Sequence, residues 1–305
     1  MESNLSQPHF HDEDAAFAYV EARVWPEGPV CPHCGGVERI SKMQGKSTRK
    51  GLYKCYQCRK PFTVRMGTIF ESSHVPLHIW LQAMYLVVGS KKGISSNQLH
   101  RTLGVTLKTA WFMSHRIREA MRDGDLAPLG GEGKFVEVDE TYIGHIKSKP
   151  VGWAFHHKMK VLSLVERGGK SRSLVIDRIG AEALVPIVKA NLDRETHIMT
   201  DEAHSYRYLA HHFAAHSHVN HRRDEYVRGE AYTNTVEGFF SIFKRGMRGV
   251  YQFCGERHLH RYLAEFDFRY SNREAVGCND EDRASRLLSG IVGKRLTYQT
   301  TCARA

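Results

Sequence analysis

Three acidic residues stand where carboxylates could act on a phosphodiester bond. Asp139 lies in the strand-like run 135–143, and Asp201 ends the short apolar run 198–201. Glu237 lies in the helix-like segment 233–244, and Lys244 follows it two turns along the same helix face. Carboxylates brought together from two strands and a helix can hold two divalent cations, Mg²⁺ or Mn²⁺, for phosphodiester chemistry.

The elements that must position these acids form a strand and helix pattern in the second half of the chain. A hairpin turn is predicted at 168–170, and a helix at 181–192. Strands are predicted over 135–143, 160–166, 173–179 and 197–201. Three antiparallel strands followed by a helix-connected strand describe an RNase H-like α/β sheet. In such a sheet the first and fourth strands are neighbours, so we expect Asp139 and Asp201 side by side.

The joint pattern matters more than any one of these acids. A single carboxylate at a strand end is more often a helix cap or part of a surface turn than a catalytic group. The 35 residues between Asp201 and Glu237 are enough for a helix, a strand and the start of another helix. Glu237 also lies in an otherwise apolar segment, where an unpaired carboxylate is costly and a bound cation would remove that cost.

Four of the seven cysteines form two Cys-x-x-Cys pairs, Cys31 with Cys34 and Cys55 with Cys58. Each pair is a tight turn that can direct two thiolates at one ion, and the 20 residues between the pairs fit a zinc ribbon. We therefore predict a structural Zn²⁺ held by four cysteines, with His33 as a spacer. The alternative is a set of unrelated buried or redox cysteines. This usage also suits a reducing cytoplasm better than a disulfide scaffold.

The charge of the chain favours a polyanionic partner. Its 305 residues suffice for two or three domains, and 44 Lys and Arg against 33 Asp and Glu give a formal net charge of +11. Such an excess favours nucleic acid over a merely basic globular protein. The sequence has no apolar run of about 18 residues and no secretory signal. We expect a cytoplasmic, nucleoid-associated protein with no membrane partner.

The predicted ribbon carries a basic surface. Segment 42–65 contains basic and aromatic residues and no acid, and we take Lys50, Arg59 and Lys60 as contacts to the DNA backbone. The alternative is a solvated face that offsets the negative zinc–thiolate centre.

Three amphipathic stretches after the ribbon predict a helix-turn-helix. Apolar stripes run over 77–88, 97–103 and 108–122, with a turn at 104–106. The residues of the last helix expected to face DNA are Lys108, Thr109, His115, Arg116 and Arg118. Any three-helix bundle gives the same apolar stripe, which is the competing interpretation.

Together these stretches resemble bacterial insertion-sequence transposases of the DDE type with an N-terminal zinc ribbon. The resemblance spans most of the chain, Phe17 to Arg273. Besides the cysteine pairs it is carried by Val138-Asp139-Glu140-Thr141-Tyr142-Ile143-Gly144, Thr200-Asp201, Val219-Asn220-His221, Asn234-Thr235-Val236-Glu237-x-Phe239-x-Ser241-x-x-Lys244-Arg245-Gly246 and Arg261-Tyr262-Leu263-x-Glu265-Phe266-x-Phe268-Arg269-Tyr270.

The resemblance implies a catalytic triad of Asp139, Asp201 and Glu237 that binds magnesium, with Lys244 as the basic residue after the last acid. Asn234, one turn before Glu237, is the alternative third ligand, because some relatives have Asn in that role. We favour Glu237 because a carboxylate binds Mg²⁺ better than an amide. DNA contacts are then expected from Asn234, His221, Arg245 and Arg248.

The expected function is a DNA transposase that cuts the ends of an insertion sequence and joins the 3′-OH to target double-stranded DNA, as a homodimer or larger assembly. Alternatives are a zinc-ribbon DNA-binding regulator with an inactive RNase H-like domain, and an RNase H-like nuclease without strand transfer. The expected domains are an N-terminal helix (1–27), the ribbon (28–71), the helix-turn-helix (74–124), the RNase H-like catalytic domain (134–275), and a C-terminal helix and tail (276–305).

Overall fold

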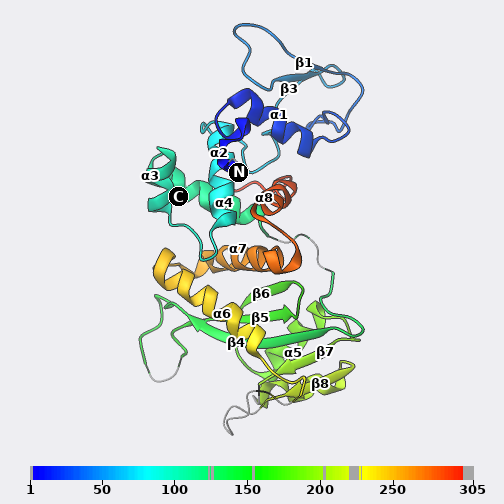
Figure 1. The fold of residues 1–305 in the computed structure, drawn as a ribbon, viewed down its shortest axis with the longest axis vertical. Helices are drawn as coiled ribbons and strands as arrows, with labels where there is room; N and C mark the ends of the chain where they lie inside the picture. The colour runs from blue at the N-terminus through cyan, green and yellow to red at the C-terminus, as the bar shows by residue number, and fades with distance from the viewer. Residues whose placement is uncertain are drawn as a thin grey trace, which may run out of the picture. The chain divides into compact units, whose positions relative to one another are not determined.

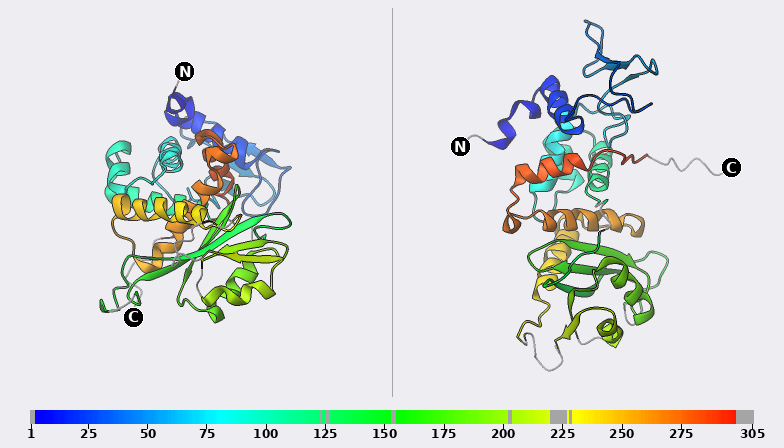
Figure 2. Two further views of the ribbon diagram at one scale, coloured as in Figure 1. Left: turned by 60° about the horizontal axis from the view of Figure 1, so that its bottom comes forward. Right: turned by 90° about the vertical axis from the view of Figure 1, so that its right-hand side faces the viewer.

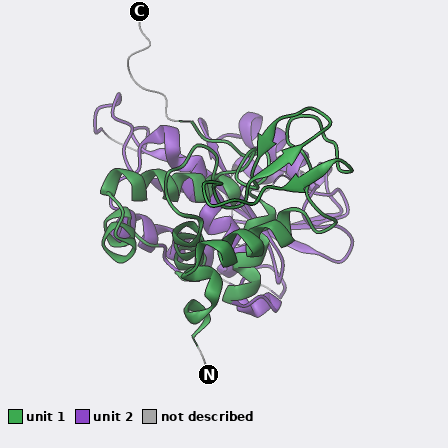
Figure 3. Ribbon diagram, turned by 90° about the horizontal axis from the view of Figure 1, so that it is seen from above, with its two compact units in different colours: residues 1–90, 94–121, 280–305 green, residues 91–93, 122–279 purple. Residues whose placement is uncertain are grey.

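The computed structural model describes residues 3–122, 124, 127–152, 155–201, 204–219, 227 and 229–297. The chain divides into two compact units (Figure 3). Unit 1 comprises residues 1–90, 94–121 and 280–305, and unit 2 comprises residues 91–93 and 122–279. The C-terminal segment therefore belongs to the same compact unit as the ribbon and the first helices.

The ribbon of unit 1 is a small antiparallel sheet preceded by a helix. Helix α1 (Glu13–Val24) begins at Asp12, whose side chain accepts a hydrogen bond from the Ala15 backbone N–H. The sheet has the order β1-β2-β3, formed by β1 (Ile40–Lys42), β2 (Tyr53–Cys55) and β3 (Pro61–Phe62). The short turns η1 (Asn4–Ser6) and η2 (Pro8–Phe10) precede α1.

The three predicted helices of unit 1 are confirmed to within two residues at each end. They are α2 (Leu77–Gly89), α3 (Ser96–Leu103) and α4 (Leu107–Ala120). Ser95 and Thr106 cap α3 and α4 through their side-chain oxygens, and Gly104 has a φ of 66°, which suits glycine at a helix end. Helix α8 (Asp280–Ser289) contacts α2 within the same unit.

Unit 2 is built on one five-stranded sheet of order β6-β5-β4-β7-β8 (Figure 1). Strand β5 is antiparallel to both of its neighbours, β4 and β6, whereas β7 runs parallel to β4 and β8 parallel to β7. The predicted adjacency of the first and fourth strands is thus confirmed. The elements are β4 (Phe135–Ile143), β5 (Met159–Glu166), β6 (Ser171–Ile176), α5 (Ala181–Asn191), β7 (His197–Thr200), η3 (His204–His211) and β8 (Ala215–His218).

Helices cover both faces of this sheet (Figures 1 and 2). Alternate β4 residues point to opposite faces, so Val136 and Val138 pack with α5 on one side while Ile143 packs with α6 and α7 on the other. The covering elements are α6 (Asn234–Gly246), the π-helical turn η5 (Met247–Tyr251), η6 (Glu256–His258), α7 (Leu259–Ser271) and η7 (Glu274–Val276).

Helix α7 is fixed to strand β6 by a buried carboxylate. Asp267 accepts hydrogen bonds from the Ser171 hydroxyl at 2.9 Å, the Ser173 hydroxyl at 2.8 Å and the Ser173 backbone N–H at 2.8 Å. Burial raises the pKa of Asp267 to about 6, against the lowering effect of these donors. Within the described ranges, no helix has the length and apolar character needed to span a bilayer.

Candidate active site and metal centre

Asp139 and Asp201 lie at one level of the central sheet. In the parallel pair of β4 and β7, Glu137 is opposite Met199, so two residues further along Asp139 is level with Asp201. Asp139 is still inside β4, whereas Asp201 directly follows the end of β7. Two carboxylates distant in the sequence are therefore neighbours because their strands are hydrogen-bonded partners.

Glu237 approaches these aspartates from the first turn of α6. Burial first, and then the nearby charges of Glu140, Asp201 and Glu237, raise the pKa of Asp139 to about 8. Oxygen ligands crowded in this way favour a hard divalent cation, which would compensate their mutual repulsion. The donor chemistry of the site thus fits Mg²⁺ or Mn²⁺.

The acids converge on one region without forming a closed cage. Among the described residues, the one group of three or more potential ligands with all ligand atoms within 4.8 Å of one another is the four cysteines of the ribbon. The oxygens of Asp139, Asp201 and Glu237 are therefore more widely spread than the cysteine sulfurs.

The environment of Glu237 differs from the sequence-based expectation. Its side chain is exposed, and its Oε1 accepts a hydrogen bond from the Thr233 hydroxyl at 3.0 Å. The argument that Glu237 is buried in an apolar segment is wrong, because Val236, Phe239 and Phe240 face the core on the other side of the helix. Asn234, one turn earlier, is likewise exposed.

Lys244 lies close enough to Asp139 for their charges to interact, as the shared helix face with Glu237 suggested. Partial burial lowers the pKa of Lys244, the charge of Asp139 opposes that effect, and the cations Arg248 and Lys158 add to it. Arg245 and Arg248 are exposed further along the same segment, and Arg245 donates to the Ser241 hydroxyl. The continuous segment of α6 and η5 therefore carries an acid, Glu237, followed by a group of cations.

A buried carboxylate missed by the sequence reasoning holds the start of α6 against the sheet. Glu137 is fully buried on the same face of β4 as Asp139. It accepts hydrogen bonds from Arg167 Nε at 2.7 Å, the Thr235 hydroxyl at 2.8 Å and the Val236 backbone N–H at 2.9 Å. Its sequence signal was an acid two residues before Asp139, at an inward-facing strand position.

Arg167 extends this contact to the chain that leads into α6. Its guanidinium donates to the backbone oxygens of Glu230 and Tyr232 at 2.8 Å each, and it stacks over the Tyr232 ring at 3.4 Å. Glu137 and Arg167 together fix the direction in which α6 leaves the sheet, and therefore the place of Glu237.

We expect replacement of Glu137 by glutamine to destabilise unit 2 by about 3 kcal/mol, because it leaves Arg167 without its buried counter-charge. Urea unfolding should show the loss, and hydrogen exchange should be faster at the Glu237 amide. In a double-mutant cycle, Arg167→Gln should cost much less in the Glu137→Gln background than in the wild type. Additive losses would show that the two side chains act independently.

Glu140 points to the opposite face from Asp139 and binds a buried tyrosine. The hydroxyl of Tyr206, a residue of η3 that is 1% exposed, donates to Glu140 Oε2. Burial raises the pKa of both groups, and the charge of Glu140 raises the pKa of Tyr206 further. The Tyr206 hydroxyl thus stabilises the Glu140 carboxylate on the face of the sheet opposite to Asp139.

A half-buried histidine contributes a pH dependence next to β7. His216 on β8 lies 2.9 Å from the Thr200 hydroxyl, and burial together with His218 and His197 lowers the pKa of His216 to about 4. Between pH 6.5 and 4 the folded chain therefore binds fewer protons than the unfolded chain. Its contribution to stability is present above pH 6.5 and is lost as the pH falls toward 4.

We expect unit 2 to lose about 1 kcal/mol of stability between pH 7 and pH 5 through this histidine, after allowance for its partial exposure. Urea midpoints at the two pH values should differ less for His216→Asn than for the wild type. His211→Asn, the same change at an exposed residue of η3, should retain the wild-type difference. An unchanged slope in His216→Asn would contradict the assignment.

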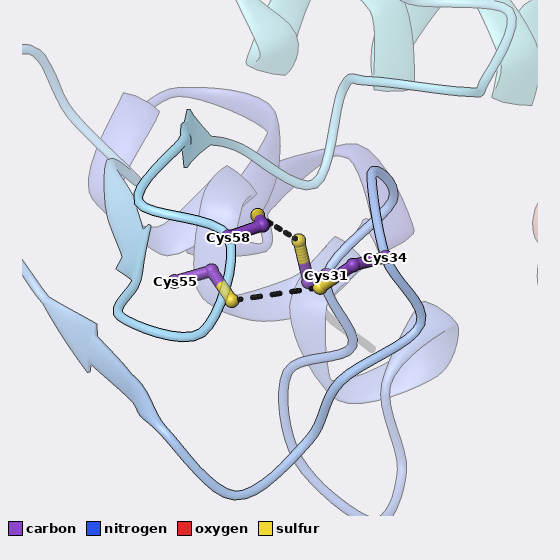
Figure 4. A group of neighbouring side chains, drawn as sticks. All are labelled: Cys31, Cys34, Cys55 and Cys58. Atoms are coloured by element: carbon purple, nitrogen blue, oxygen red, sulfur yellow. Dashed lines mark hydrogen bonds between the residues drawn. The ribbon is translucent and has the colours of Figure 1, made fainter.

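The four cysteines of the ribbon bring their sulfurs within 4.8 Å of one another, close enough to bind one metal ion (Figure 4). Cys31 and Cys58 sulfurs are 3.6 Å apart, and those of Cys34 and Cys55 are 3.7 Å apart. Zinc–sulfur bonds of about 2.3 Å in a tetrahedron place sulfurs about 3.8 Å apart. The fit confirms the predicted zinc ribbon, and His33, which lies near the Pro61 carbonyl, is outside the cysteine set.

The basic residues of the ribbon lie on its surface. Lys50, Arg59 and Lys60 are all exposed, and Lys50 forms an ion pair with Asp14 at 2.7 Å. Arg59 has a φ of 62°, so it takes the left-handed position after the second cysteine pair that Gly35 takes, at 72°, after the first. Their contact with DNA stays a prediction.

Several expected DNA contacts on α4 are wrong. Arg116 is 4% exposed and donates to the backbone oxygens of Ile69 and Glu71 at 2.6 and 2.7 Å. His115 and Arg118 are 1% and 2% exposed. The apolar stripe of the helix predicted these three residues on the exposed face. They are buried because other segments of the chain pack against α4 on more than one side.

The other candidates differ in their accessibility. Lys108 is exposed at the start of α4, whereas Thr109 is half-buried and its hydroxyl lies 2.8 Å from that of the capping residue Thr106. His221 lies outside the described residues.

Comparisons with known proteins agree with this combination of elements. The model of the ISXO2-like transposase domain matches residues 128–271, and the model of the transposase zinc-ribbon domain matches residues 11–61. Together the two matches cover more than half of the chain. The chain belongs to the insertion-sequence transposases with an N-terminal zinc ribbon.

Two individual proteins extend the comparison. An uncharacterized protein in transposable element ISH50 of Halobacterium salinarum is 27% identical over 265 residues, which cover 80% of this chain and 86% of that protein. A chain in the cryo-EM structure of a simian T-cell lymphotropic virus intasome with PP2A regulatory subunit B56 gamma is 16% identical, with a TM-score of 0.29. That match covers 55% of this chain and 63% of the other.

Proposed function

We propose that this transposase cuts DNA at the ends of its element and joins the freed 3′-OH to target DNA, with unit 2 as an RNase H-like catalytic domain. The proposal depends on one observation. Asp139 and Asp201 stand level on adjacent parallel strands, and Glu237 and Lys244 on α6 lie within range of electrostatic interaction with Asp139. Regulation without catalysis would not require carboxylates held together at such an electrostatic cost.

Asp139, Asp201 and Glu237 would hold the catalytic cations. Mg²⁺ or Mn²⁺ bound there supplies Lewis-acid stabilisation of the phosphate oxygens and lowers the pKa of an attacking water. The widely spread oxygens need to approach one another when the site is loaded. Glu237 is the exposed member of the three, and its Oε1 accepts a hydrogen bond from the Thr233 hydroxyl at the start of α6.

The cations of α6 have a separate task. Lys244 lies within range of electrostatic interaction with Asp139, and Arg248 lies close enough to lower the pKa of Lys244. A phosphate bound between them would restore the charge balance of Lys244 and be held next to the acids. Arg245 and Asn234, exposed on the same helix, would bind the neighbouring backbone.

The reaction consists of two displacements at phosphorus. Water first attacks the phosphodiester at the element end, the bond from phosphorus to the 3′ oxygen breaks, and that oxygen takes a proton to become a 3′-OH. This 3′-OH then attacks a target phosphodiester, forms a new bond to its phosphorus and displaces a target 3′ oxygen. Neither step needs a covalent bond between protein and DNA.

Unit 1 would bind the element ends, through the exposed ribbon residues Lys50, Arg59 and Lys60 and through Lys108 on the helix-turn-helix. Two DNA ends must be joined to one target, so a homodimer or larger assembly on DNA is expected. A protein with this function would act at the nucleoid.

The test uses the purified full chain and a labelled duplex that carries the terminal inverted repeat of the element. With Mg²⁺ we expect a nick that exposes a 3′-OH and, with added target DNA, a joined product; with EDTA neither should form. Binding without any cleavage would establish a regulator instead. Cleavage without joining would establish a nuclease.

A further inference from the structure

Phe253 is an aromatic ring that the fold presents to solvent at the end of the active-site helix segment. It is 65% exposed, whereas its neighbour Cys254 is 8% exposed and belongs to the core shared with α6 and α7. On the other side Tyr251 packs on Tyr262, with ring centroids 4.8 Å apart, and donates its hydroxyl to Glu265. Phe253 is thus an outward ring between two inward-facing residues.

The backbone that holds this ring is strained. Gln252 has φ 58° and ψ −44°, and the Phe253 N–H donates to the Tyr251 carbonyl at 2.6 Å. This is the γ-turn with positive φ, which is rare for a residue that has a side chain. The exposed ring adds nothing to the core, so stability does not explain why the strained turn is kept. Binding of a ligand by the ring does offer an explanation.

A positively charged side chain lies next to the Phe253 ring. The Lys147 ammonium, on the exposed loop after β4, lies 5.5 Å from the Phe253 centroid. Ile146, next to Lys147, is buried in the same core as Cys254, so both segments are held by common packing. Arg248 is exposed one turn before the ring, and it is close to Lys244.

We propose that Phe253 stacks on an unpaired nucleobase of DNA while Lys147 binds the phosphate beside it. A nucleotide fits this combination better than an apolar protein surface, because it brings the π face of its base and the negative charge of its phosphate on one ligand. The inference rests on the proposed function for its location. The seven residues from Lys244 to Tyr251, where the helical segment ends, correspond to at most about 10 Å of helix, or about three base steps. The ring would therefore receive a base a few nucleotides from the phosphate at the acids.

The test measures stacking without chemistry, in the full chain and without added Mg²⁺. The probes are a short single-stranded oligonucleotide with one 2-aminopurine and a duplex of the same sequence. We expect the wild type to quench the single-stranded probe. Phe253→Ala should lower affinity for it about tenfold and remove the quenching, with little change for the duplex. Phe253→Trp should restore both properties, and Phe253→Leu should not.

Tyr208→Ala is the matched control. Tyr208 is 56% exposed on η3, which packs with α5 on the other side of the sheet from α6. Its loss should leave single-strand binding unchanged. The inference is overturned if Phe253→Ala binds and quenches like the wild type, if Phe253→Leu substitutes for the ring, or if affinity for the duplex falls equally.

The two proposals fail in different ways. Loss of quenching in Phe253→Ala combined with no cleavage by the wild type under any metal condition would remove the proposed function and leave a base-stacking site. Normal cleavage and joining together with unchanged quenching in Phe253→Ala would remove the stacking site and leave the proposed function.

Discussion

Replacement of Asp201 by asparagine is expected to reduce DNA cleavage and joining by about 10³-fold or more while DNA binding persists. Such a factor corresponds to about 4 kcal/mol of lost transition-state stabilisation, within the several kcal/mol that metal ions provide in such reactions. Asparagine has nearly the same shape as aspartate but lacks the charge needed to hold a cation. One fewer negative charge near bound DNA should leave affinity equal or slightly higher.

The measurement is single-turnover cleavage of the labelled end duplex, with binding of the same duplex followed in parallel. Asp177→Asn is the matched control, because Asp177 also directly follows a strand of the same sheet but is exposed after β6. It should cleave at the wild-type rate. Cleavage by Asp201→Asn at a rate near that of the wild type would mean that the acids have no part in the chemistry.

The same assay decides between Glu237 and Asn234 as the third ligand. We expect Glu237→Gln to lose cleavage as Asp201→Asn does, because Glu237 is the group whose charge acts on Asp139. Asn234→Ala should keep the chemical step and weaken DNA binding. The reverse pattern would assign the third position to Asn234.

Removal of zinc is expected to unfold the ribbon. Structural zinc binding contributes about 10–16 kcal/mol in small zinc domains, far more than the ribbon core could replace. That core contains three fully buried side chains, Cys31, Cys55 and Phe62, and two of these are themselves ligands. Cys55→Ser should therefore abolish zinc content and ribbon structure together. Backbone N–H groups of Cys58 and Gln57 lower the pKa of Cys55 to about 7, which already favours its thiolate.

Elemental analysis would measure the loss of zinc, and amide hydrogen exchange over residues 31–62 would measure the loss of ribbon structure. His33→Ala is the control inside the first cysteine turn and should retain zinc, because His33 lies outside the cluster. The sheet of unit 2 contains none of the ligands, so its protection should remain unchanged. Retention of one zinc by Cys55→Ser would show that the metal is held by another set of residues.

The elements themselves were largely predictable from the sequence, because each depends on residues near in the chain. Strand β4 was predicted at its observed bounds, and α2 through α4 to within two residues. Strand β8 was not predicted, since its sequence Ala-His-Ser-His has neither an apolar run nor alternation. It forms because β7 offers an open edge for pairing.

Individual side chains were less predictable because their environment comes from distant segments. Arg116 looked like a surface residue, yet carbonyl groups from Ile69 and Glu71 surround it. Glu137 was passed over in favour of Asp139, two residues away on the same strand face. The contacts that Arg167 and the start of α6 make with Glu137 are what identify it as a positioning carboxylate, in contrast to Asp139.

The sequence by itself determined the zinc centre, four of the five strands of the unit 2 sheet and the three acids worth testing. Cysteine spacing and hydrophobic periodicity are local features of the sequence, so the metal centre and the secondary structure can be predicted from them without knowing the fold. The tertiary structure alone decided the register of β4 against β7, the exposure of Glu237, and the exposure of Phe253 to solvent. Those facts depend on strand register and on packing between remote segments, which no local pattern encodes.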